Sequence, residues 1–144
     1  MKQNIVKRED ILDVYVDGAS RGNPGPSAWS YLFMVGNKEI DKKAGYIGHG
    51  TNNQAEYNAI INALKDAKKY TRWHIKVYSD SELVVKHIIG EYRIIASHLV
   101  PLCMEIYELE NFFQKVEFFN VGRDNKLISR CDELCNKCLN EKGY

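Results

Sequence analysis

The sequence lacks several features that define common classes of protein. It contains no apolar run near the ~20 residues of a membrane-spanning helix, and its start, MKQNIVKRED, lacks the apolar stretch of a signal peptide. An excess of one charge is also absent, because 20 Lys and Arg residues stand against 19 Asp and Glu residues. A generic polybasic nucleic-acid binder is therefore excluded, and any nucleic-acid contact must come from a local patch and a metal. We expect a cytoplasmic protein without a membrane partner.

Cysteine is scarce, with four residues in a chain of 144. In the cytoplasm we expect reduced thiols rather than disulfides. Cys131, Cys135 and Cys138 are four and three residues apart, a spacing that places them on one face of a helix. We interpret them as small buried side chains, because three thiols along one helix do not converge on a tetrahedral zinc ion.

A chain of this length suggests one domain. Residues 1–10 are polar and are expected to form a loose leader, followed by a single domain over residues 11–142. β-Branched and aromatic runs predict strands, and apolar residues that recur every three or four positions predict helices. The predicted strands are residues 11–17, 28–35, 38–47, 73–79 and 115–121. The predicted helices are residues 51–70, 81–89, 99–113 and 127–139, and the predicted glycine-containing loops are residues 18–26 and 48–50.

The order of these elements predicts an α/β fold. Three strands joined by short connections form an antiparallel meander, whereas strands that follow helical crossovers lie parallel to the first strand. The expected architecture is a mixed five-stranded sheet, with three antiparallel strands and then parallel additions, flanked by helices. We expect the first and fourth strands to be neighbours at its centre.

Two acidic residues occupy unusual positions. Asp17 ends the first predicted strand, where α/β sheets place their sites, although an Asp there also serves to start a turn. Glu56 shares the apolar face of its helix with Ala59 and Ile60, so its carboxylate projects toward the sheet. An unpaired buried carboxylate is unfavourable, which favours a partner such as a metal. The alternative for Glu56 is a capping box with Asn53.

Two further acids gain meaning from the topology. Alone, Asp80 is typical of a helix N-cap and Asp132 of a solvated helix face. If the first and fourth strands are adjacent, however, Asp17 and Asp80 emerge side by side, and Glu56 reaches them from the helix above. Crowded carboxylates raise one another's pKa values, and Mg²⁺, which prefers oxygen ligands, removes the repulsion. Two such ions ~4 Å apart can hydrolyse a phosphodiester.

Four stretches carry a resemblance to type 1 ribonuclease H, which covers roughly residues 11–140. They are residues 16–25 (VDGASRGNPG), 51–56 (TNNQAE), 78–81 (YSDS) and 130–134 (RCDEL). The resemblance implies that Asp17, Glu56, Asp80 and Asp132 are catalytic and bind two Mg²⁺ or Mn²⁺ ions. It also implies an endoribonuclease that cuts the RNA strand of RNA–DNA hybrids and leaves 5′-phosphate and 3′-hydroxyl ends.

The same resemblance implies a set of substrate contacts. These are Gly18, Asn23, Asn52, Asn53, Gln54, Ser81 and Arg123. Asparagine amides suit hydrogen bonds to minor-groove base edges and to the 2′-hydroxyls that distinguish RNA from DNA. The alternative for Asn52 and Asn53 is capping of the helix that follows.

The chain departs from the family pattern in two places. Many members carry a protrusion rich in Lys and Trp, whereas residues 90–97 hold one Arg and no Trp, so we expect the compact branch with fewer phosphate contacts. Many members also carry a His before the last acid, whereas residues 122–128 have none. Arg123 is the nearest candidate for that role. Being permanently charged, it could hold a phosphate but could not shuttle protons; the alternative is a surface arginine paired with Asp124.

The sequence thus predicts a metal-dependent ribonuclease H whose partner is an RNA–DNA hybrid. No protein partner is implied, and we expect a monomer. Two alternatives stay open: a module that binds hybrid or double-stranded RNA without cutting it, and a related nuclease that acts on another nucleic acid.

Overall fold

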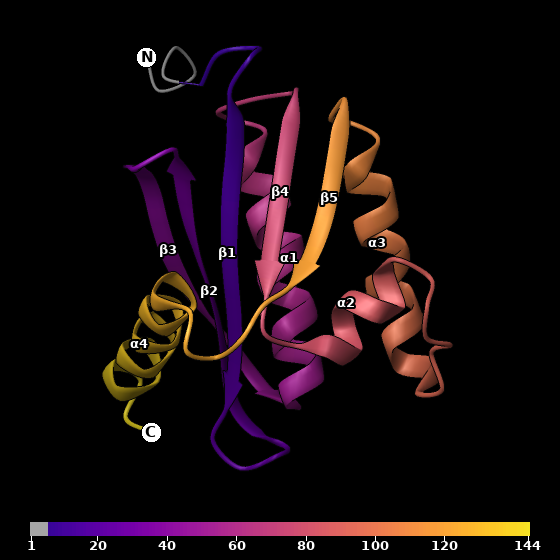
Figure 1. Ribbon diagram of the computed structural model, residues 1–144. Helices are drawn as coiled ribbons and strands as arrows, with labels where there is room; N and C mark the ends of the chain where they lie inside the picture. The colour runs from indigo at the N-terminus through magenta and orange to yellow at the C-terminus, as the bar shows by residue number, and fades with distance from the viewer. Residues whose placement is uncertain (1–5) are drawn as a thin grey trace.

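The computed structural model describes residues 6–144 and shows one five-stranded sheet with helices on both faces (Figure 1). Residues 1–5 of the expected leader lie outside the described residues. Within the rest of that segment, Val6 is buried in the hydrophobic core, and the Lys7 amide donates to the Asp10 carboxylate over 2.9 Å. Among the described residues, no helix combines the length and apolarity needed to cross a membrane.

The sheet confirms the predicted fold class and strand directions. Its strands are β1 (Ile11–Ser20), β2 (Gly25–Val35), β3 (Lys38–Gly50), β4 (His74–Ser79) and β5 (Lys115–Asn120). Their order across the sheet is β3-β2-β1-β4-β5, with β1, β2 and β3 antiparallel and β4 and β5 added parallel to β1. The crossovers between parallel strands bring β1 and β4 together at the centre, as predicted.

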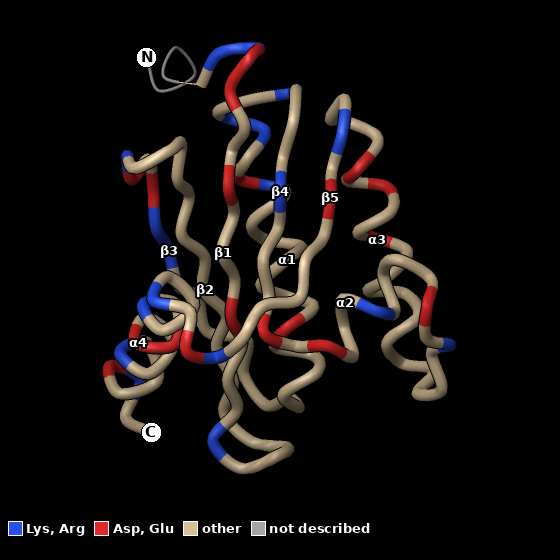
Figure 2. Tube along the Cα trace, viewed as in Figure 1, with Lys and Arg blue, Asp and Glu red and all other residues tan. Residues whose placement is uncertain are grey.

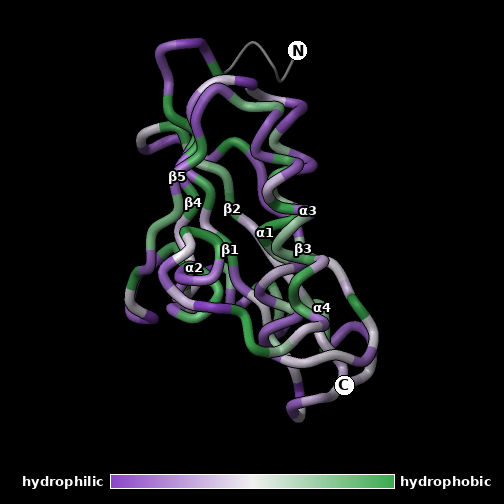
Figure 3. The backbone as a smooth tube through the Cα atoms, turned by 90° about the vertical axis from the view of Figure 1, so that its right-hand side faces the viewer, coloured by the Kyte–Doolittle hydropathy of each residue, from purple (hydrophilic) through white to green (hydrophobic). Residues whose placement is uncertain are grey.

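The helices divide between the two faces of the sheet. They are α1 (Asn52–Ala67), α2 (Glu82–Ile88), α3 (Val100–Glu110) and α4 (Lys126–Glu141), with a short 3₁₀ turn, η2 (Ser97–Leu99), before α3. In Figure 1, α1 lies behind the sheet and α4 lies in front of it, where α4 contacts β1, β2 and β3. In the side view of Figure 3, hydrophobic segments concentrate where the central strands face α1 and α3.

Several predicted boundaries were wrong around the glycine-rich segments. The predicted loops at 18–26 and 48–50 are largely strand, because β1 continues to Ser20, β2 begins at Gly25 and β3 continues to Gly50. Pairing with a neighbour overrides the low strand propensity of glycine, since Gly18 pairs with Trp29 and Gly25 with Gly50. The first and third helices also end earlier than predicted, at Ala67 and Glu110.

Small side chains let α1 lie close to the sheet. Its buried face is rich in alanine, with Ala55, Ala59, Ala63 and Ala67 all fully buried. A Cβ atom at Gly18 would collide with the backbone of α1 at Ala55 and at the following residue. Only glycine fits there, so this close approach brings the N-terminal turns of α1 directly over β1.

The cysteines confirm the interpretation as buried thiols. All four are free, and Cys103, Cys131 and Cys135 are buried while Cys138 is half-buried. The thiol of Cys135 contacts the Asp17 carbonyl at 3.6 Å and the Ser30 hydroxyl at 3.3 Å. The C-terminal helix therefore packs onto the face of the sheet opposite α1, against the strand segment that carries Asp17.

Candidate active site

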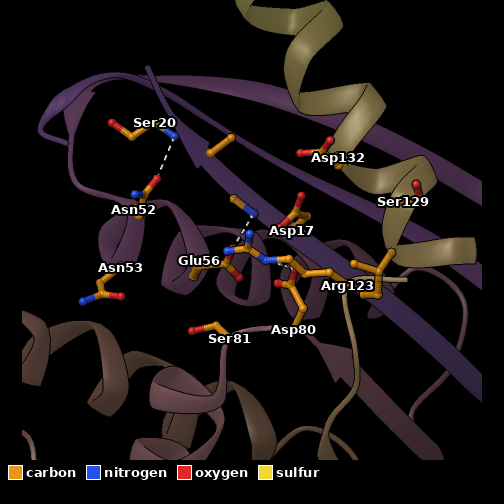
Figure 4. Close-up of a pocket in the computed structure, with 13 residues that line it drawn as sticks. Asp17, Ser20, Asn52, Asn53, Glu56, Asp80, Ser81, Arg123, Ser129 and Asp132 are labelled. Atoms are coloured by element: carbon orange, nitrogen blue, oxygen red, sulfur yellow. Dashed lines mark hydrogen bonds and ion pairs between the residues drawn. The ribbon is translucent and has the colours of Figure 1, made fainter. Parts of the chain in front are cut away.

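A polar cleft of about 440 Å³ opens where β1, β4, α1 and α4 meet (Figure 4). Its lining contains all the predicted site residues except Asn23 and Gln54. The predicted residues that line it are Asp17, Gly18, Asn52, Asn53, Glu56, Asp80, Ser81, Arg123 and Asp132. Figure 2 shows the acidic segments of β1 and of the β4–α2 turn close together, whereas Lys and Arg are spread over the rest of the chain.

Asp17 is placed by the unequal pairing of β1. The prediction that Asp17 ends its strand was wrong, because β1 pairs with β2 as far as Ser20. On the other side, pairing with β4 stops at Tyr15 and Tyr78. Asp17 therefore extends past the last paired residue of β4 and lies beside the turn that follows that strand, with only 6% of its surface exposed.

Glu56 is placed by the start of α1. The capping box there is formed by Thr51 and Gln54, whose backbone and side-chain groups bond reciprocally at 2.9 and 3.1 Å. The alternative of a capping box with Asn53 was therefore wrong, and Glu56 is free of any capping role. Its Oε1 atom accepts from the Gly18 amide at 3.0 Å, which turns the carboxylate toward β1.

Three of the four predicted acids form one cluster. Asp17, Glu56 and Asp80 each offer a carboxylate oxygen, and these oxygens all lie within 4.8 Å of one another. Asp132 lies apart from this triad: it is exposed on α4 and lines the same cleft from the opposite side (Figure 4). Its Oδ2 atom accepts from the Asn136 amide at 3.3 Å.

The acidic triad resists full ionisation. Burial is the largest cause that raises the pKa of Asp17, to about 7, and the charges of Asp80 and Asp132 add to it. Burial and then the charges of Asp17 and Asp80 raise the pKa of Glu56 well above its ordinary value. A cluster of hard oxygen donors that repel one another is the arrangement that a divalent cation such as Mg²⁺ stabilises, so the residues present fit such an ion.

Arg123 brings a positive charge to the edge of this cluster. Its Nε atom lies 3.7 Å from Asp80 Oδ2, and its side chain is 93% exposed. Burial raises the pKa of Asp80, and the Arg123 charge opposes that shift. Among the described residues Arg123 forms this pair and none with Asp124, so the alternative of an Arg123–Asp124 surface pair was wrong.

Two of the remaining predicted residues, Asn23 and Asn52, form a latch between the β1–β2 hairpin and α1. The Asn52 amide donates to Asn23 Oδ1, and Asn52 Oδ1 accepts from the Ser20 amide, both at 3.0 Å. Asn23 therefore supports the rim of the cleft without lining it, and Gln54 is occupied by the capping box. On the opposite rim, the Ser81 hydroxyl caps α2 by accepting from the Val84 amide at 3.3 Å.

Sequence reasoning missed one residue that contacts the acids. Ser79 is fully buried at the end of β4, and its hydroxyl lies 3.4 Å from Glu56 Oε2. The only sequence signal is a small polar residue immediately before Asp80, in a strand whose alternate residues face the core. That signal does not distinguish this contact from an ordinary buried serine.

Comparison with known proteins gives consistent matches. A family model described as RNase H matches residues 9–137. Ribonuclease HI of Halobacterium salinarum is 37% identical over 131 residues, which cover 90% of this chain and 65% of that relative. The chain spans 35% of the length of three mycobacterial relatives at 30% identity.

Two solved structures are similar over most of their length. The crystal structure of RNase H1 from Halobacterium salinarum has a TM-score of 0.86 at 34% identity, covering 91% of this chain and 98% of that one. The crystal structure of LC11-RNase H1 in complex with an RNA/DNA hybrid has a TM-score of 0.85 at 29% identity, with the same coverage.

Proposed function

The chain belongs to the RNase H family, and from this premise we propose that it is a type 1 ribonuclease H. It hydrolyses the RNA strand of RNA–DNA hybrids internally and leaves 5′-phosphate and 3′-hydroxyl ends. The observation that carries this proposal is the convergence of Asp17, Glu56 and Asp80 within 4.8 Å in a cleft that Asp132 also lines. The LC11 relative, whose structure contains an RNA/DNA hybrid, supports the choice of substrate.

The acids supply the cation sites of the reaction. Asp17, Glu56, Asp80 and Asp132 would hold two Mg²⁺ or Mn²⁺ ions, because carboxylate oxygens are the donors these cations prefer. When bound, two such cations activate a water and stabilise the departing 3′-oxygen of a phosphodiester. The buried position of Asp17 and Glu56 strengthens their electrostatic interaction with a cation, because water screens it less there.

The rest of the cleft orients the substrate. Asn52 and Asn53, at the N-terminus of α1, offer amide groups to the minor groove and to 2′-hydroxyls. The N-terminus of a helix also favours a phosphate. Glu56 also orders the attacking water or a 2′-hydroxyl. Arg123, exposed at the rim, holds the phosphate or the leaving group as a fixed cation. Catalysis then depends on position and preorganised charge.

We further propose that a monomer is the active form, because a single chain supplies all four acids predicted to be catalytic. All of them also fall within residues 11–142, the span proposed as the catalytic domain.

A cleavage assay tests this proposal. End-labelled RNA–DNA hybrid, RNA duplex, DNA duplex and single strands of one sequence are incubated with the protein, with and without Mg²⁺. We expect internal cuts in the RNA of the hybrid only, dependent on the metal. A gel shift of the hybrid without cleavage would favour a binding module instead, and cleavage of DNA duplex would favour a related nuclease.

A further inference from the structure

Ser79 is a buried residue that contacts three parts of the active site. It is the last residue of β4, it directly precedes Asp80, and its side chain has no exposed surface. Water cannot replace a partner of such a group, so its hydrogen bonds are made within the protein.

The direction of the hydroxyl bond is fixed by its neighbours. The Ser81 amide donates to Ser79 Oγ at 3.1 Å, so one lone pair of that oxygen is occupied. A serine hydroxyl has one proton to donate, and Glu56 Oε2, at 3.4 Å, is the acceptor that faces it. Since the Gly18 amide donates to Oε1, each oxygen of Glu56 has one protein donor.

The backbone of Ser79 also anchors the loop that carries Arg123. Its carbonyl accepts from the Val121 amide at 2.9 Å and from the Asn120 side chain at 3.1 Å. The residue thus contacts the start of α2 through Ser81, α1 through Glu56, and the β5–α4 connection through its carbonyl. The backbone bonds survive any substitution of the side chain, so the hydroxyl can be tested separately.

We propose that Ser79 is a positioning residue whose hydroxyl holds the Glu56 carboxylate in the orientation that the acidic triad needs to bind a divalent cation. The carboxylates that ligate metals are commonly hydrogen-bonded by a neighbouring group, and loss of that neighbour weakens metal binding about 10–100-fold. Because the Ser79–Glu56 contact is long, the lower end of that range applies. The inference rests on the proposed function only for the identity of the cation.

Magnesium titration followed by ¹H–¹⁵N NMR tests the proposal without substrate. The Gly18 amide donates to Glu56, so its chemical shift reports on the carboxylate directly. For Ser79→Ala we expect Mg²⁺ binding about tenfold weaker than in the wild type, equivalent to about 1.4 kcal/mol. Ser79→Thr, which keeps the hydroxyl, should restore the wild-type affinity, and thermal melting checks that each variant is folded.

Ser27→Ala is the matched control. Ser27 is another fully buried serine, but the acceptors that face its hydroxyl are the Gly25 carbonyl at 2.8 Å and the Gly50 carbonyl at 3.1 Å rather than an acid. Unchanged Mg²⁺ affinity in Ser79→Ala, or equal weakening in Ser27→Ala, overturns the proposal. If Ser79→Ala does not fold, the near-isosteric Ser79→Cys, a weak donor, replaces it with the same expected direction.

Catalysis separates this proposal from the nuclease proposal. In steady-state cleavage at limiting Mg²⁺, Ser79→Ala should lower kcat and leave the KM for hybrid unchanged, because the hydroxyl faces Glu56 rather than the rim. A wild type that fails to cleave hybrid would refute the nuclease function, while the NMR titration would still decide the role of Ser79.

Discussion

Replacing Asp17 with Asn should abolish hydrolysis and at the same time stabilise the metal-free protein. Asp17 is 6% exposed and shares the cluster with Glu56 and Asp80. Its pKa is raised from 3.8 to about 7, which at 1.36 kcal/mol per pKa unit corresponds to a cost of about 4 kcal/mol for the ionised form. Asn has nearly the same shape, can still hydrogen-bond Glu56 and carries no charge.

The sign follows from proton linkage. In the unfolded chain Asp17 loses its proton near pH 3.8, whereas in the folded chain it keeps the proton to about pH 7. The folded state therefore binds more protons between these values, so stability falls as pH rises from about 4 to 7, and the penalty is complete above pH 7. Asn carries no charge and removes this penalty. Asp17→Asn should therefore be more stable than the wild type at pH 8 and equally stable at pH 4.

Thermal denaturation in EDTA measures this effect. At pH 8 we expect Asp17→Asn to melt about 12 °C above the wild type, since a stabilisation of about 4 kcal/mol raises the melting temperature of a domain of this size by ~3 °C per kcal/mol. The control is Glu133→Gln on the exposed face of α4, which should change melting by little at either pH. Equal melting of Asp17→Asn and wild type at pH 8, or the same advantage at pH 4, would refute the reasoning, and full nuclease activity in Asp17→Asn would remove its catalytic assignment.

Three further outcomes follow from the same geometry. Arg123→Ala should lower kcat about tenfold in single-turnover cleavage while the melting temperature stays constant, because an exposed ion pair with Asp80 adds little stability; a normal rate would show that Arg123 does not touch the substrate. Asn52→Ala breaks the latch to Ser20 and should raise the KM for hybrid about fivefold, the effect of one hydrogen bond of about 1 kcal/mol, and an unchanged KM in steady-state kinetics would contradict this. Added Mg²⁺ should raise the melting temperature more at pH 8 than at pH 5, because protonated Asp17 and Glu56 cannot ligate it; calorimetry that shows equal shifts would argue against a cation site there.

The order and type of the secondary-structure elements could be predicted from local sequence. The β-branched and aromatic run of β1 predicted a strand, the three- and four-residue spacing of α1 predicted a helix with one buried face, and both were confirmed. Predictions failed where glycine dominates, at residues 18–26 and 48–50, because those strands are held by pairing with β2 and β3 rather than by local preference.

The candidate site likewise contains residues that could be predicted from the sequence and contacts that could not. Asp17 and Glu56 could be proposed because an acid at a predicted strand end and an acid on an apolar helix face are unusual in their local surroundings. Asp80 could be proposed because the predicted topology places it beside Asp17. The latch of hydrogen bonds that joins Asn52 to Asn23 and Ser20 could not be predicted, because it depends on how the hairpin folds back onto α1.

The amino-acid order alone indicated the strands and helices, because their patterns belong to residues near one another in the chain, and the order of these elements then predicted the sheet topology. Only the tertiary structure decided that Arg123 pairs with Asp80 and that the Ser79 hydroxyl meets Glu56. Such contacts join residues from different elements, and their geometry depends on how closely α1 and the β5–α4 connection approach the sheet. The absence of a side chain at Gly18 lets the backbone of α1 at Ala55 lie close to β1, and no local pattern encodes that distance.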